Sequence, residues 1–221
     1  AAAAADPFVQ LRRWLDEAPV THRGWEWRYL DRLADLSLRS QAAHAGAITS
    51  LAVSADGQWL ATGGGGPCLP LLLRCDAPEV SAGEQFYLEK VVQEGAACAF
   101  SPDSRTLAVQ STKNISLWDV NTRTLRHRLV RPAGSLGYLT AFSPDGRLPA
   151  ALGPHWDLWL LDPATGQRLA TLTPPAPALC GAIKFSPDST LLAAALANGT
   201  LQVWDLPELR RRLAAEGLDW R

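Results

Sequence analysis

The sequence predicts an all-β fold, namely a β-propeller of four blades (small, or partial) with short flanking α-helices. The prediction rests on a turn that recurs four times, on an aspartate that follows each turn at a constant spacing, and on the strand-like segments between them. A period of about 43 residues that contains four short strands is the unit of a propeller blade.

The repeated turn combines serine and aspartate with proline or glycine, residues that fix tight turns through a restricted φ or through local hydrogen bonds. A strand follows each turn and ends in an aspartate, and successive aspartates are 43 residues apart. The turns are Ser54–Gly57, Ser101–Ser104, Ser143–Gly146 and Ser186–Ser189. The third strands are expected to end at 76, 119, 162 and 205.

The last repeat shows the strand pattern most clearly. Residues 179–185 predict a first strand, 191–195 a second and 200–204 a third, and the dipeptide Asn198–Gly199 predicts a tight hairpin between the last two. Fourth strands are expected between the repeats, at 36–41, 86–92, 125–130 and 168–173.

The strand at 36–41 precedes the first blade, whereas the chain turns helical after Asp205. Pairing of 36–41 with 200–204 would complete the last blade and remove two exposed strand edges. We therefore predict that the chain closes the last blade with its N-terminal strand.

A Ser-Pro-Asp-Gly turn followed by Trp-Asp resembles the repeat of WD-repeat β-propellers, and the resemblance covers about residues 36–206. Two repeats contain the Trp-Asp dipeptide itself, as Trp118–Asp119 and Trp204–Asp205. The resemblance implies a non-enzymatic protein–protein interaction scaffold with a protein partner of unknown identity.

The two flanks resemble those of planctomycete WD-repeat proteins, many of which sit behind a serine/threonine kinase domain. The resemblance lies in 22–30, in 206–213 and in 217–220. The chain also begins without methionine, as expected for a piece of a longer protein. These features imply the docking or sensory region of a larger bacterial serine/threonine kinase.

The repeats depart from the family in their polar residues. Well-formed repeats bury an Asp–His–Ser/Thr–Trp hydrogen-bond set, whose aspartate is replaced here by Leu69, Thr112, His155 and Asn198. A histidine in the loop entering a blade occurs as His44. Apolar packing must therefore carry more of the stability, with Trp118 and Trp204 as packing anchors. In the first repeat, Pro67 and Pro70 predict an irregular or edge third strand.

Three regions are expected along the chain: an N-terminal helical segment at 1–35, the propeller at 36–206 and a C-terminal helix at 207–221. The N-terminal segment predicts two helices with apolar stripes, which we interpret as core-forming. The stripes are Phe8, Leu11, Trp14 and Leu15, and then Trp27, Leu30, Leu33 and Ala34.

Composition argues against several function classes. The formal net charge is −1, without the basic face that nucleic acid or an anionic membrane would need. The cluster Arg210–Arg212 is interpreted as a solvated helix face. The four cysteines and four histidines lack metal-ligand spacing, and no phosphate or dinucleotide motif occurs. We expect no catalytic, cofactor or metal site, no membrane span and a cytoplasmic location.

Two alternatives remain open. A propeller enzyme or small-ligand binder would use the central channel, yet Lys184 is the one ionisable residue expected on the first strands of the four repeats. An eroded array without present function is the other, because four blades lie at the lower end of the usual range.

Partner-binding residues are expected on the loops entering each blade and on those joining second to third strands. Exposed aromatic and basic residues are typical of interface hot spots. The alternative for Trp156 is that it packs inward to fill the gap left by the missing polar set. The candidate residues are His44, Lys113, Arg131, His155 and Trp156.

Overall fold

The computed structural model describes residues 7–34, 44, 46–64, 67–75, 85–88, 93–94, 96–132, 139–175 and 178–215. The chain divides into two compact units, Ala1–Ala42 and Ala43–Arg221, and each is considered by itself.

The N-terminal unit is a pair of helices, α1 (Pro7–Glu17) and α2 (Trp25–Ala34), joined by the 3-10 turn η1 (Val20–His22). Leu15 is buried, and the indole N–H of Trp27 donates to its carbonyl at 2.9 Å. The prediction that both stripes form core is wrong for Trp14, which is 65% exposed, and for Leu30, which is 39% exposed, because a helix this short buries one narrow face against its partner.

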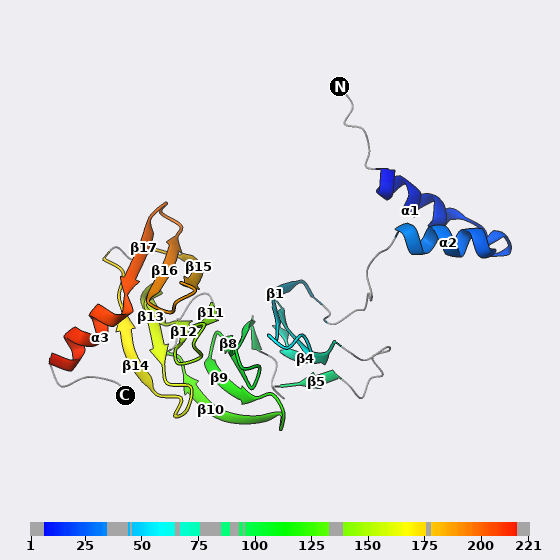
Figure 1. Cartoon of the computed structure of the whole chain (residues 1–221). Helices are drawn as coiled ribbons and strands as arrows, with labels where there is room; N and C mark the ends of the chain where they lie inside the picture. Colours follow the sequence, from blue (N-terminus) through cyan, green and yellow to red (C-terminus); the bar gives the residue numbers. More distant parts are fainter. Residues whose placement is uncertain are drawn as a thin grey trace. The chain divides into compact units, whose positions relative to one another are not determined.

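The second unit is mostly β, and its four largest antiparallel sheets are arranged as the blades of a four-bladed β-propeller (Figure 1), which confirms the predicted fold class. The blades are numbered 1 to 4 along the chain. Blade 1 contains β1 (Ile48–Val53), β2 (Trp59–Gly64), β4 (Leu71–Arg74) and β5 (Gln85–Tyr87). Blade 2 contains β7 (Ala96–Phe100), β8 (Thr106–Ser111), β9 (Asn114–Asp119) and β10 (Thr124–Val130). Blade 3 contains β11 (Thr140–Phe142), β12 (Pro149–Leu152), β13 (Leu158–Leu161) and β14 (Arg168–Leu172). Blade 4 contains β15 (Cys180–Phe185), β16 (Leu191–Leu196) and β17 (Leu201–Asp205), followed by helix α3 (Leu206–Ala215).

The third strand of blade 1 corrects a prediction. It was expected to be irregular or at an edge, but β4 is a regular strand that pairs with β2 on one side and β5 on the other. The reason is the position of the prolines: both precede Leu71, and Pro67 lies in the separate two-residue strand β3 (Pro67–Cys68), which pairs with β6 (Gln93–Glu94). No ladder hydrogen bond within the sheet of blade 1 is therefore lost to proline.

Within the described residues, blade 4 has three strands, and the segment 36–41 that was predicted to complete it lies outside the described residues. The predicted fourth strand of the first repeat is described only in part, as β5. The other two fourth strands lie where predicted, as β10 and β14.

Each repeated turn is stabilised by the same three hydrogen bonds. In blade 2 the hydroxyl of Ser101 donates to Oδ1 of Asp103 at 2.5 Å and accepts the N–H of Thr106 at 2.9 Å. The same carboxylate oxygen accepts the N–H of Arg105 at 3.0 Å. The fourth turn residue has a positive φ in every blade: Gly57 (69°), Ser104 (60°), Gly146 (76°) and Ser189 (62°).

The two serines at positive φ also link neighbouring blades. The N–H of Asp56 in blade 1 donates to Oγ of Ser104 in blade 2 at 3.1 Å, and the N–H of Asp145 in blade 3 donates to Oγ of Ser189 in blade 4 at 3.0 Å. A side chain at positive φ costs about 1–2 kcal/mol relative to the right-handed region. The hydrogen bond to the neighbouring blade offsets part of this cost.

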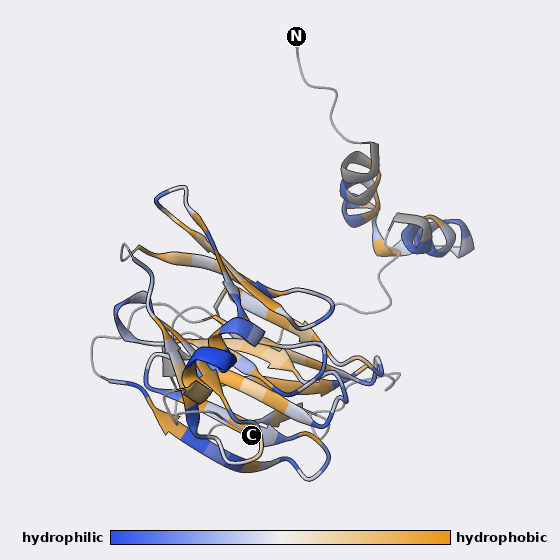
Figure 2. Cartoon of the chain, turned by 60° about the vertical axis from the view of Figure 1, so that its left-hand side comes forward, coloured by the Kyte–Doolittle hydropathy of each residue, from blue (hydrophilic) through white to orange (hydrophobic). Residues whose placement is uncertain are grey.

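The blades pack through repeated rows of three residues that run across the strands of a sheet. The side of a blade that faces the next blade along the chain is called its forward face, and the opposite side its backward face. On the forward faces, cross-strand pairing forms the rows Ala52–Ala61–Leu72, Ala99–Ala108–Leu117 and Ala141–Ala150–Leu160. The second and third members of each row are buried. Figure 2 shows hydrophobic residues, in orange, along many of the strands.

The seam between blades 2 and 3 contains a buried amide in place of the serine contact. Gln110 is fully buried, its Nε2 donates to the carbonyl of Leu152 at 2.6 Å, and its Oε1 accepts the N–H of Leu152 at 3.1 Å. The side-chain amide of Gln110 thus bonds to both the carbonyl and the N–H of Leu152, as the backbone of a paired strand would.

Replacement of Ser104 by alanine should destabilise the chain by about 1 kcal/mol, because the contact with Asp56 is lost while the positive φ is retained. Ser104→Gly should cost less than Ser104→Ala, since glycine removes the backbone strain along with the hydrogen bond. Urea unfolding of both variants tests this, and the reverse order would contradict it.

Acid should remove a contribution of Asp119 to stability. The N–H of Thr122 and, against opposing desolvation, Arg126 lower the pKa of this carboxyl from 3.8 to about 2. Because the folded state favours the charged form, the contribution is present above pH 3.8 and is lost as the pH falls towards 2. Asp119→Asn should therefore lower the free energy of unfolding at pH 7 and converge with the wild type near pH 2. A difference that is independent of pH would contradict the argument.

Trp118→Ala should cost about 3–5 kcal/mol, as large-to-small changes in a packed core do. Trp118 is 9% exposed, and its buried indole N–H has no acceptor in the described part of the chain. Trp118→Phe should therefore cost much less than Trp118→Ala, because it removes no hydrogen bond. Trp204 is only partly buried, so the stability lost in Trp204→Ala should lie between the losses in Trp118→Phe and Trp118→Ala. Thermal or urea melts of the three variants measure the order.

Candidate functional site

The predicted partner-binding residues gather at one end of the propeller. This end, called the hairpin end, carries the turns at 112–113, 153–157 and 197–200, opposite the end with the Ser-Asp turns. Described residues from three blades contribute to it: His44, Lys113, Arg131, His155 and Trp156.

Arg131 supports this end from inside rather than facing a partner. Its side chain is 3% exposed, one guanidinium nitrogen donates to the carbonyl of Ser111 at 2.7 Å, and its backbone N–H donates to the carbonyl of Lys113 at 2.8 Å. Burial lowers the pKa of Arg131 to about 10. The guanidinium therefore fixes the second-to-third strand turn of blade 2.

His155 and Trp156 lie in the 3-10 turn η2 (Pro154–Trp156) and have φ values of 54° and 68°. His155 is exposed, whereas Trp156 is half-buried and packs against the core shared by blades 3 and 4. The turn follows Gly153, where a Cβ would come within 2.5 Å of the indole nitrogen of Trp159. Close packing of Gly153 on Trp159 thus fixes the backbone of the turn. This backbone leaves the indole of Trp156 partly exposed to solvent.

His44 retains one contact of the family's polar set. A ring nitrogen of His44 lies 2.7 Å from the hydroxyl of Thr62 on β2, and burial lowers the pKa of the ring. The residues aligned with Thr62 in the other blades are apolar: Val109, Ala151 and Ala194. Among the described residues, this histidine–hydroxyl contact is therefore confined to blade 1, as the degraded repeat motifs imply.

The exposed members of the set lie on neighbouring turns. Lys113 belongs to blade 2 and His155 with Trp156 to blade 3, and the Gln110–Leu152 hydrogen bonds lie at the base of the two turns. We call these three residues the hairpin-end patch. It combines one cation, one imidazole and part of an indole on a rigid base.

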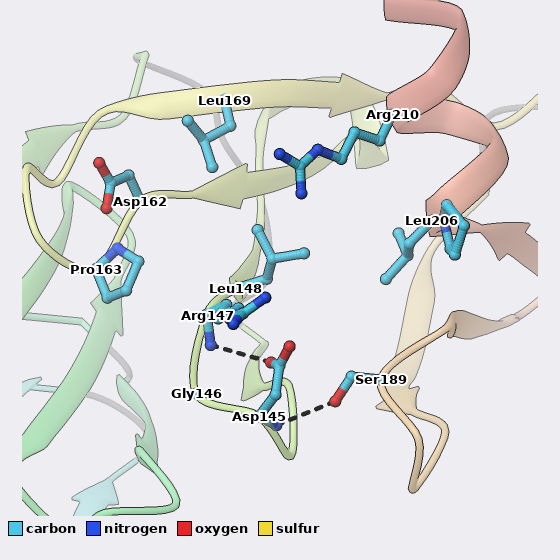
Figure 3. A pocket seen from close by; sticks show the side chains of 11 residues that line it. Asp145, Gly146, Arg147, Leu148, Asp162, Pro163, Leu169, Ser189, Leu206 and Arg210 are labelled. Carbon is cyan, nitrogen blue, oxygen red and sulfur yellow. Dashed lines mark hydrogen bonds between the residues drawn. The ribbon is translucent and has the colours of Figure 1, made fainter. Parts of the chain in front are cut away.

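A cavity of about 720 Å³ lies at the opposite end, between the Ser-Asp turns of blades 3 and 4 and helix α3. Figure 3 shows Arg210 extending from α3 across this space, with Leu148 and Leu206 below it. The volume is within the range of small-molecule sites. Sequence reasoning missed the cavity because its walls come from at least four separate segments, and the basic cluster of α3 was interpreted as a solvated face.

The acidic residues of the cavity are engaged in turn structure. Desolvation would raise the pKa of Asp145, but the Ser143 hydroxyl, the N–H of Arg147 and the charge of Arg147 lower it overall. Asp162 likewise accepts the N–H of Ala164 at 2.8 Å and the hydroxyl of Thr165 at 2.7 Å. Both carboxyls are therefore held ionised by their own loops.

The described residues were searched for chemistry of other kinds. On the four innermost strands, Lys184 is the one side chain charged at neutral pH. Within the described ranges, no group of three His, Cys, Asp or Glu side chains is arranged to hold a metal ion. None of the helices in that part of the chain has the length and apolar character needed to cross a bilayer.

Comparison with known proteins supports the repeat assignment. Residues 36–66 and 166–205 match the family model described as WD domain, G-beta repeat. The second match contains β14 and all of blade 4, and the first contains β1 and β2.

Two relatives are informative. A protein LST8 homolog of Drosophila melanogaster is 32% identical over 166 residues, which is 71% of this chain and 51% of the relative. The small ribosomal subunit protein RACK1 of Caenorhabditis elegans is 30% identical over 127 residues, or 53% of this chain and 38% of the relative. The chain spans about half the length of these relatives or less. Repeat, sheet topology and family match agree that segments of this chain match WD40 repeats.

Proposed function

We propose that the chain is a non-catalytic protein-interaction scaffold that binds its partner through the hairpin-end patch. The observation that carries the proposal is the exposure of Lys113, His155 and part of Trp156 on turns that are fixed from below by Arg131 and Gln110. Binding residues usually lie on loops held by a rigid scaffold, and aromatic and basic side chains dominate interface energies.

Two further considerations support this function. WD40 repeats are typical of scaffolds, and one relative is by name a ribosomal subunit protein, a component of a larger assembly. The flanks support a finer proposal, that the scaffold is the docking or sensory region of a serine/threonine kinase. Sequencing the upstream reading frame tests it, since a frame without a kinase domain would refute that part.

A second candidate function uses the cavity at the Ser-Asp end. Its volume of about 720 Å³ and its leucine floor favour a small ligand or a partner side chain. We favour this cavity over a ligand site in the central channel, because the four innermost strands, which line the channel, offer few polar groups.

Partner binding should depend on the hairpin-end patch. Lys113→Glu and Trp156→Ala should each lower recovery of a specific partner by about tenfold or more, the range expected for hot-spot residues. Affinity purification from the native host with quantitative mass spectrometry measures the loss against the wild type.

The matched controls are Arg147→Glu and Arg210→Glu at the cavity, which should leave recovery unchanged. Loss of the partner only in these two variants would transfer the function to the cavity. Recovery that none of the four variants affects would overturn both candidates.

A further inference from the structure

The two turns that carry the hairpin-end patch belong to different blades, so their spacing depends on the seam between blades 2 and 3. Lys113 lies on the turn that follows β8, whereas His155 and Trp156 lie on the turn that follows β12. A partner that contacts all three residues must therefore span the seam. Loops that are already ordered in the bound arrangement lose less conformational freedom on binding, so a fixed spacing of the two turns favours affinity.

Gln110 links the two turns at their bases. Lys113 lies three positions after Gln110, and His155 lies three positions after Leu152. The side-chain Nε2 of Gln110 donates to the carbonyl of Leu152 at 2.6 Å, and Oε1 accepts the N–H of Leu152 at 3.1 Å. This N–H is shared with the carbonyl of Leu139 at 3.0 Å, so Nε2 makes the stronger bond. Two hydrogen bonds from one planar amide fix both the distance and the orientation between the two strand ends.

Further hydrogen bonds connect each end of this link to its turn. In blade 2 the hydroxyl of Ser111, the residue after Gln110, accepts the N–H of Lys113 at 3.3 Å and that of Asn114 at 3.1 Å. In blade 3 the residue after Leu152 is Gly153, whose N–H donates to the carbonyl of Asp157 at 2.7 Å and closes the turn. A displacement of either strand end at the seam therefore moves the turn attached to it.

The amide is specific to this seam. The residues aligned with Gln110 in blades 1, 3 and 4 are Gly63, Leu152 and Ala195, and none of these has a polar side chain. The seams after blades 1 and 3 thus form without an amide at this position. Gln110 is fully buried, and burial of a polar group destabilises a protein unless its hydrogen bonds are made. General packing of the blades therefore does not explain a glutamine here.

We propose that Gln110 is a positioning residue for partner binding. Through Leu152 it holds the two turns of the hairpin-end patch at a fixed spacing, so that one segment of the partner contacts both blades. Gln110 itself is fully buried and does not touch the partner. The inference rests on the proposed function, because it describes how the partner engages the same patch.

Hydrogen exchange of backbone amides tests the positioning without a partner. Gln110→Met retains an unbranched side chain but removes both hydrogen bonds to Leu152. The amides of Asn114 and Gly153, one in each turn, should then exchange about tenfold faster than in the wild type, because both turns open more often. The amide of Gly146, which donates to the carbonyl of Ser143 at the opposite end, should be unaffected.

Ser104→Ala is the matched control, because it removes one hydrogen bond between blades at another seam. It should leave the exchange of Asn114 and Gly153 unchanged. Three results would overturn the proposal: faster exchange in the turn of blade 2 alone, unchanged exchange in both turns, or an equal acceleration at Gly146. The last result would show a general loss of stability instead of a change in the spacing of the turns.

Gln110→Glu adds a dependence on pH that a merely space-filling side chain would not produce. A buried carboxyl has a raised pKa, and in its neutral form its O–H can donate to the carbonyl of Leu152 as the amide does. The ionised form has no donor and faces that carbonyl with a negative charge. Exchange at Asn114 and Gly153, taken relative to the wild type at the same pH, should therefore approach the wild-type rate as the pH falls from about 8 to about 5. A ratio independent of pH would contradict the role of the hydrogen bonds.

Partner recovery from the native host separates this inference from the proposed function. Gln110→Met should lower recovery of the same proteins that Lys113→Glu loses, although it leaves every exposed residue of the patch in place. If Lys113→Glu and Trp156→Ala leave recovery unchanged, the proposed function fails, whatever the exchange rates. If those two variants lower recovery and Gln110→Met does not, the proposed function stands and the positioning role of Gln110 is overturned.

Discussion

Close approach of one sheet to the next is the constraint on which the propeller depends. Alanine at the first two positions of the forward rows of blades 1 to 3 lets neighbouring blades come near, and the leucine at the third position fills the wider space further out, as in Ala99–Ala108–Leu117. Sheets pack well only when large and small side chains interdigitate. The repeated turns then set where each sheet begins, so that the rows face one another.

The polar set that many WD40 repeats bury is largely replaced by other interactions in this chain. One histidine–threonine contact remains in blade 1, while a buried arginine and a buried glutamine hold turns and seams elsewhere. A buried polar group is stabilising only if its hydrogen bonds are made. The contacts of Gln110 with the backbone of Leu152 meet this requirement without a partner side chain.

The sequence predicted much of the fold because the signals concerned are local and repeated. A serine, an aspartate and a residue tolerant of positive φ define each turn, and alternation defines the strands around it. The regular third strand of blade 1 was missed because the prolines before it obscured its start. The inward direction of Arg131 and the cavity beside Arg210 were also missed, because both depend on segments distant in sequence.

The candidate patch was predictable as a set of loops but not as a surface. Blade topology places Lys113 and His155 at the same end, and that follows from strand order alone. Which side chains point outwards depends on backbone details such as the positive φ of His155 and Trp156, and those arise from packing beneath Gly153.

The alternation of glycine and serine at positive φ has a mechanical consequence. Blades 1 and 2 share one large apolar core and blades 3 and 4 another, and each pair is also joined by a hydrogen bond between turns. The seam between blades 2 and 3 has a smaller core around Ile115 and Trp159. The propeller is therefore built of two-blade modules with separate cores, and the two hydrogen bonds between Gln110 and Leu152 join these modules at the middle seam.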